Sequence, residues 1–170
     1  MKHSDNLHKM LQLSEKVFHA KGDPRQIAFT PQDMQHLSSI HPFTLNEKNT
    51  QEGPVCWVTL IPTSIDIMLQ FLDGKIHENE LLSLTNSSTE FEAIYLCSAL
   101  TLPEYRNNGM TLEIAVNAIQ NISKDAEIKY LFAWPFSLEG KKLSEKIAQF
   151  TKIPILFFEQ KPLKGKELIP

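Results

Sequence analysis

Short apolar runs alternate along the chain with segments in which apolar residues recur every three or four positions. The runs hold few charged residues, which is typical of strands buried on both faces of a sheet, and they lie at 55–61, 92–102, 128–134 and 155–158. The helical spacing predicts amphipathic helices over 5–20 and 109–123. A helical turn or two is predicted over 78–84, and a charged helix at about 138–149. Another helix is predicted from Thr63 or Ser64 to Gly74, and a short one after Thr30, because Pro31 suits the first helical position.

The order of these elements predicts a mixed α/β fold. The strands at 92–102 and 128–134 are joined by a helix, and this connection is long enough for the right-handed crossover between parallel strands. Antiparallel partners and flanking helices complete the sheet, so it is mixed rather than doubly wound. A chain of 170 residues is expected to form one domain, 1–170, in which 1–53 is an N-terminal helical part with a polar loop or hairpin turn at 43–53.

The composition limits the classes of partner. A formal net charge of −3 gives no general attraction to nucleic acid or anionic lipid, so any phosphate site has to be local. No segment approaches the ~20 apolar residues of a membrane span, and the histidines show no metal-ligand spacing. Cys56 and Cys97 lie within apolar runs and are interpreted as reduced core residues. With no continuous hydrophobic stretch at the N-terminus, these features predict a cytoplasmic protein without a nucleic-acid, membrane or metal partner.

The stretch after the second apolar run has the features of a phosphate-binding loop. It reads Leu100-Thr101-Leu102-Pro103-Glu104-Tyr105-Arg106-Asn107-Asn108-Gly109-Met110-Thr111 and leads from a strand into an amphipathic helix. Backbone N–H groups of the first helical turn have no intrahelical partner, and the helix dipole adds partial positive charge there. Gly109 lets the backbone approach a ligand closely, and Arg106 adds a full positive charge. A solvated arginine in an ordinary strand-to-helix turn is the alternative.

This stretch resembles the pyrophosphate loop of the GNAT superfamily of acyl-CoA N-acyltransferases. Members have an Arg or Gln, two variable residues, a Gly, one variable residue and a small residue after their fourth strand, and many carry Pro-x-Tyr-Arg there. Two more features fall in register: the strand that ends near Trp134, and Ser144-Glu145-Lys146-Ile147, where the family often has Tyr-Glu-Lys-Leu. The resemblance covers about residues 92–150 and implies a central mixed sheet with a V-shaped splay between two parallel strands. It further implies that acetyl-CoA binds with its pantetheine on the backbone of Leu100, Thr101 and Leu102 and its pyrophosphate on Arg106, Asn107, Asn108, Gly109, Met110 and Thr111.

Three departures from the family pattern bear on the chemistry. Thr111 stands where the family usually has Gly or Ala, and its hydroxyl is an alternative donor to a phosphate oxygen. Ser144 occupies the position of a tyrosine that protonates the leaving thiolate in many members, and a serine hydroxyl is a poorer acid. The helical material at 63–88 interrupts the tight hairpin expected before the loop strand, so 55–61 matches either the third strand of the family or its first.

The resemblance implies transfer of an acetyl or short acyl group from acyl-CoA to an amine by direct attack in a ternary complex. The amine must lose a proton, so the reaction needs a carboxylate base, for which Glu92 is the first candidate, followed by Glu90 and Glu104. Backbone N–H groups near Leu102 are expected to polarise the thioester carbonyl. The alternative is a non-catalytic CoA-binding or regulatory module. The sequence names no acceptor, and the apolar stripe at 7–18 can dock on the same chain or on a second copy, which leaves a homodimer open.

Overall fold

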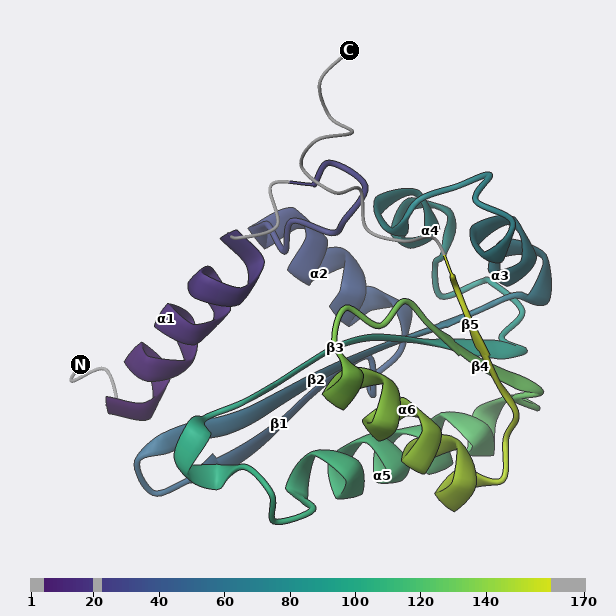
Figure 1. The fold of residues 1–170 in the computed structure, drawn as a ribbon. Helices are drawn as coiled ribbons and strands as arrows, with labels where there is room; N and C mark the ends of the chain where they lie inside the picture. Colours follow the sequence, from purple (N-terminus) through teal and green to yellow (C-terminus); the bar gives the residue numbers. More distant parts are fainter. Residues whose placement is uncertain (1–4, 20–22, 160–170) are drawn as a thin grey trace.

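The fold is built on one mixed sheet of five strands (Figure 1). The computed structural model describes residues 5–19 and 23–159. The strands lie side by side in their chain order: β1 (Leu45–Thr50), β2 (Gly53–Thr63), β3 (Ala93–Thr101), β4 (Tyr130–Ala133) and β5 (Ile155–Phe157). Neighbours are antiparallel from β1 to β3 and parallel from β3 to β5. The predicted mixed α/β sheet is therefore confirmed.

Helices cover both faces of this sheet (Figure 1). One face carries α1 (Asp5–His19), α2 (Pro31–Ile40), α3 (Ile65–Leu72) and α4 (Glu78–Leu84), and the other carries α5 (Met110–Asp125) and α6 (Leu138–Thr151). The division follows from the alternation of side chains along each strand. Leu60 and Ile94 pack in the cluster that includes α5, whereas their neighbours Ile61 and Tyr95 pack in the cluster that includes α3 and α4.

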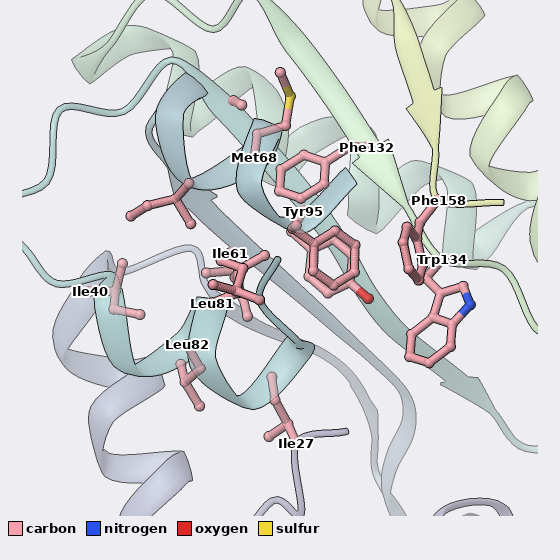
Figure 2. Packing of buried hydrophobic residues seen from close by; sticks show 14 of the residues in the cluster. Ile27, Ile40, Ile61, Met68, Leu81, Leu82, Tyr95, Phe132, Trp134 and Phe158 are labelled. Atoms are coloured by element: carbon pink, nitrogen blue, oxygen red, sulfur yellow. The ribbon is translucent and has the colours of Figure 1, made fainter. Parts of the chain in front are cut away.

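A group of aromatic side chains fills the core on the α3 and α4 side. The ring of Phe71, which is 1% exposed, lies 5.1 Å from Tyr95, 5.8 Å from Phe132 and 5.2 Å from Phe158 between ring centroids. Phe158 also meets Trp134 edge-on, at 5.4 Å (Figure 2). These contacts join α3 to β3, to β4 and to the chain that follows β5.

The pairing of β3 with β4 ends earlier along the strand than its pairing with β2. β3 pairs with β4 only from Ala93 to Leu96, opposite 130–133, while its pairing with β2 continues to Thr101. A β-bulge lies at the same place, because Thr59 is opposite Ser98 and Leu60 is opposite Leu96, which makes Cys97 the extra residue. The segment 97–101 of β3 therefore extends past the end of β4.

The strands and helices predicted from the apolar pattern are confirmed to within a few residues, and one segment needs correction. Residues 43–53, expected to be a loop or hairpin turn inside a helical part, contain β1 and a turn into β2. β1 is an edge strand whose last four residues are exposed, so it shows no apolar alternation, and its strand conformation comes from pairing with β2. The tail at 161–166, interpreted as a hairpin turn or frayed end, lies outside the described residues.

Candidate functional site

The loop between β3 and α5 takes two residues through left-handed backbone conformations. After a single 3-10 turn (Pro103–Tyr105), Asn107 has a φ of 62° and Gly109, the N-cap of α5, has a φ of 78°. A Cβ added at Gly109 would meet no atom within 4 Å. Glycine is therefore favoured here by the backbone conformation and not by crowding, and the space in front of the helix is open.

The first turn of α5 presents polar groups to this open space. Residues 106–109 are exposed, and the amide of Met110 donates to Oδ1 of Asn108 at 3.1 Å. The amides of Thr111 and Leu112 have no carbonyl four positions back within the helix, so they are available for an outside acceptor. Together with the helix dipole, this arrangement suits a phosphate group.

Arg106 is held at the end of β3. Its Nε donates to the carbonyl oxygen of Thr101 at 2.9 Å, which holds the guanidinium at the last residue of β3. The remaining N–H groups belong to an exposed side chain. The arginine thus caps the strand and brings a full positive charge to the loop.

Thr111 points toward the sheet. Its hydroxyl lies 2.8 Å from the hydroxyl of Thr101, which also donates to Sγ of Cys56 at 3.3 Å. A β-branched residue fits in the first turn because its side chain packs underneath the loop. The geometry gives the Thr111 hydroxyl a partner in β3 and leaves phosphate contacts to the backbone.

The backbone of β3 past the bulge offers one open edge. The amide of Leu102 donates to the carbonyl of Val55 at 3.0 Å, so this N–H is engaged with β2 and is not available to polarise a thioester. Because backbone groups alternate in direction along an antiparallel strand, Ala99 and Thr101 direct theirs to the opposite edge, where β4 has ended. The side chains of Leu100 and Leu102 pack with that of Met10 instead. Of the three strand residues expected to bind pantetheine, only Thr101 directs its backbone groups to this edge, and its carbonyl oxygen already accepts from Arg106.

The two residues expected to take part in proton transfer lie elsewhere. Glu92 precedes β3 at the end far from the loop, on the order of 30 Å from Arg106 at the usual rise per strand residue. Its Oε1 pairs with Nζ of Lys129 at 2.9 Å, and this hydrogen bond lowers the pKa of Glu92. Ser144 is buried in α6, where its hydroxyl donates to the carbonyl of Gly140 at 2.9 Å. Neither side chain is brought to the loop by a described contact.

A buried carboxylate lies beside the bulge instead. Glu78, at the start of α4, is 4% exposed. Its Oε1 accepts from the hydroxyl of Tyr95 at 2.8 Å and lies 3.8 Å from Sγ of Cys97, while Oε2 accepts from the amide of Ile27 at 2.8 Å. Burial and the negative charge of Glu78 raise the pKa of Tyr95 well above its usual value, so the phenol stays a donor. Sequence reasoning missed this cluster, and its only local signal is two polar side chains, Tyr95 and Cys97, two positions apart on one strand.

The segment that covers Glu78 also reaches the end of β4. The guanidinium of Arg25 lies over the ring of Trp134, at 5.3 Å from the centroid, and its Nε donates to Oδ1 of Asp23 at 2.9 Å. That hydrogen bond lowers the pKa of Asp23. The carbonyl of Arg25 accepts from the amide of Asn79 at 3.3 Å, which fixes the segment to α4. Residues 23–27 therefore close the α4 side of the place where β3 and β4 part.

A groove of about 320 Å³ lies between α1 and the 3-10 turn. Its lining combines cationic, amide and apolar side chains with one carboxylate, from Lys9, Gln12, Leu13, Lys16, Leu102, Pro103 and Glu104. Nζ of Lys9 bridges Asp5 at 3.1 Å and Glu104 at 3.5 Å. Asp5 belongs to α1 itself, so the pair with Glu104 is the one that links α1 to the chain that leads into the loop.

Comparison with family models, curated proteins and solved structures found no match for this chain. Within residues 5–19 and 23–159, no helix is long and apolar enough to cross a membrane. The functional assignment therefore depends on the geometry of the loop and of the open strand edge.

Proposed function

We propose that the chain is an acyl-CoA-dependent N-acyltransferase of the GNAT type. The observation that supports this most is the continuity of two features: the edge of β3 left open past Leu96, and the Arg106–Gly109 loop to which that edge leads. In the proposal, the end of pairing between the parallel strands is the mouth of a V-shaped splay. An extended pantetheine chain fits such an edge, since it offers amide groups to a strand backbone.

In this proposal, acetyl-CoA lies along both the Arg106–Gly109 loop and the open edge of β3. The pyrophosphate lies on the first turn of α5, where backbone amides, the helix dipole and Arg106 all favour an anion. The pantetheine runs along Ala99 and Thr101 toward the bulge at Cys97, which places the thioester near the end of β4. The acceptor amine attacks the acyl carbon directly, in a ternary complex.

A non-catalytic CoA-binding or regulatory module is the second candidate. It is favoured by the position of Ser144, whose hydroxyl donates to its own helix, and of Glu92, which is paired with Lys129 far from the loop. The two candidates share the cofactor site and differ in turnover.

The first test is isothermal titration of the protein with acetyl-CoA. Replacing Arg106 with Ala is expected to weaken micromolar binding at least tenfold, about 1.4 kcal/mol. The control is Lys124→Ala, which removes one positive charge from the exposed far end of α5 and should leave affinity unchanged. Absence of binding by the wild-type protein would overturn both candidates. Binding without turnover on a broad amine panel would support the regulatory module.

A further inference from the structure

The buried carboxylate of Glu78 occupies an unusual place for a charged group. Carboxylates are seldom buried without a dedicated set of partners, because removing them from water is costly. Glu78 has such a set in the Tyr95 hydroxyl, the Cys97 thiol and the Ile27 amide. The two oxygens of Glu78 thus accept from three donors, and a carboxylate oxygen is the kind of group that takes up a proton in general-base catalysis.

The position of this carboxylate follows from the sheet. Tyr95 is still paired with β4, and Cys97 is the bulge residue directly after the last paired residue, Leu96. The Oε1 atom of Glu78 contacts both Tyr95 and Cys97, so it lies at the level where the two strands part. In the proposed complex, the same level holds the thioester.

The three donors around Glu78 differ in how deeply they are buried. The segment at 23–27 covers Oε2 through the Ile27 amide, and Tyr95 is buried beneath Oε1. Of these three donors, Cys97 is the one that is only half-buried. In the proposal, a group that reaches the bulge from the open edge of β3 approaches Glu78 past Cys97.

We propose that Glu78 is the catalytic base that takes the proton from the acceptor amine, an inference that rests on the proposed acyltransferase function. The amine nitrogen attacks the acyl carbon and the C–N bond forms while its proton passes to the Glu78 carboxylate. The C–S bond then breaks, the electron pair leaves with the CoA sulfur, and the proton returns from Glu78 to that sulfur. Amine and acyl-CoA thereby become amide and CoA, and Glu78 is again ionised. Tyr95 is a positioning residue, because its hydroxyl holds Oε1 in place.

The decisive variant is Glu78→Gln, tested for acetyl-CoA affinity and for acetyl-CoA consumption with an amine panel and with water as acceptor. Loss of a general base is expected to lower the rate on the order of 100-fold or more with affinity unchanged. The control is Glu139→Gln, which also removes a carboxylate from the first turn of a helix but at an exposed position of α6. Consumption is followed by chromatography of CoA, so the free thiols of the protein do not interfere.

Each outcome of this experiment decides the point. A Glu78→Gln variant that binds and consumes acetyl-CoA within about threefold of wild type overturns the role of Glu78 and leaves the proposed function standing. A wild-type protein that binds acetyl-CoA but consumes none overturns it too, in favour of the non-catalytic module. A wild-type protein that binds none removes the proposed function itself.

Two further variants test the role of Glu78 if Glu78→Gln does not fold. Glu78→Asp retains the carboxylate and is expected to keep part of the rate. Tyr95→Phe is expected to lower kcat about tenfold with KM unchanged and to move the midpoint of the pH–rate profile, because the carboxylate loses one donor. An unchanged kcat and midpoint in Tyr95→Phe would refute the positioning role. The profile is interpreted with the other titratable or charged groups around Glu78 in view: Tyr95, Cys97, His77, Asp23 and Arg25.

Discussion

Replacing Gly109 with Ala tests whether the loop depends on its left-handed backbone. An L-residue in this region of conformation costs roughly 1–2 kcal/mol. The added methyl group meets no atom within 4 Å, so no steric term adds to this cost. The lower entropy of alanine in the unfolded chain offsets roughly 0.4–1 kcal/mol. The expected net loss of folding stability is therefore about 1 kcal/mol.

Thermal unfolding provides the measurement. For a domain of this size, a loss of about 1 kcal/mol lowers Tm by about 2–4 °C. Gly109→Asn is the matched comparison, because asparagine tolerates the left-handed region better than alanine and should lose less. Gly140→Ala is the second comparison: Gly140 has no positive φ, and its added Cβ would lie 3.2 Å from Oγ of Ser137. The change in Tm of Gly140→Ala should therefore reflect only the difference in helix propensity and the contact with Ser137.

The same variant reports on the cofactor site. The new methyl group points into the open space before α5, where the pyrophosphate is proposed to lie, so acetyl-CoA affinity should fall along with Tm. A Gly109→Ala protein as stable as wild type would show that the loop does not need the left-handed conformation, and the reasoning from φ would be refuted. A lower Tm with unchanged affinity would support the backbone argument. It would contradict the proposed placement of the phosphate.

Two more predictions concern stability. Phe71→Ala should lower the free energy of unfolding by about 3–5 kcal/mol, because removing a fully buried ring at the centre of the aromatic group leaves a cavity. Denaturant unfolding with an unchanged m-value measures this loss, and a loss under about 1 kcal/mol would contradict the packing. Lys129→Met should remove the stabilisation from the Glu92 pair. Since the folded-state pKa of Glu92 is lowered, that contribution exists above its unfolded pKa of about 4.3 and is lost as the pH falls through the folded value. Wild type and Lys129→Met should therefore differ in Tm at neutral pH and converge once the pH has fallen below the folded-state pKa of Glu92, and a constant difference across this range would count against the pair.

Much of the fold could be predicted from local pattern. The strand at 92–102, the helix after Gly109 and the strand before Trp134 follow from apolar runs and helical spacing, and the structure has β3, α5 and β4 there. The edge strand β1 could not be predicted in this way, because its residues are polar and its conformation depends on β2 as a partner. The bulge at Cys97 also escapes prediction, since a register shift is a property of two strands and not of one.

The residues of the candidate site also differ in whether the sequence could predict them. The loop from Arg106 to Gly109 could be identified in the sequence, because a glycine, an open helix N-terminus and a nearby cation depend on neighbours in the chain; the positive φ of Asn107 was not predicted. The carboxylate proposed as the base, Glu78, was not predicted from the sequence. Glu92 was suggested by its proximity to the loop strand in sequence, but its place at the far end of that strand pairs it with Lys129.

The sequence by itself therefore determined the strand–helix–strand unit and the position of the loop that joins β3 to α5, since backbone conformation and amphipathic stripes arise from residues a few positions apart. Only the tertiary structure decided which carboxylate meets the bulge. Glu78 accepts from Ile27, 51 positions away, and from Tyr95, 17 positions away. Contacts of this kind form when separate elements pack on the same sheet face, and no local pattern encodes which of the chain's carboxylates will be buried there.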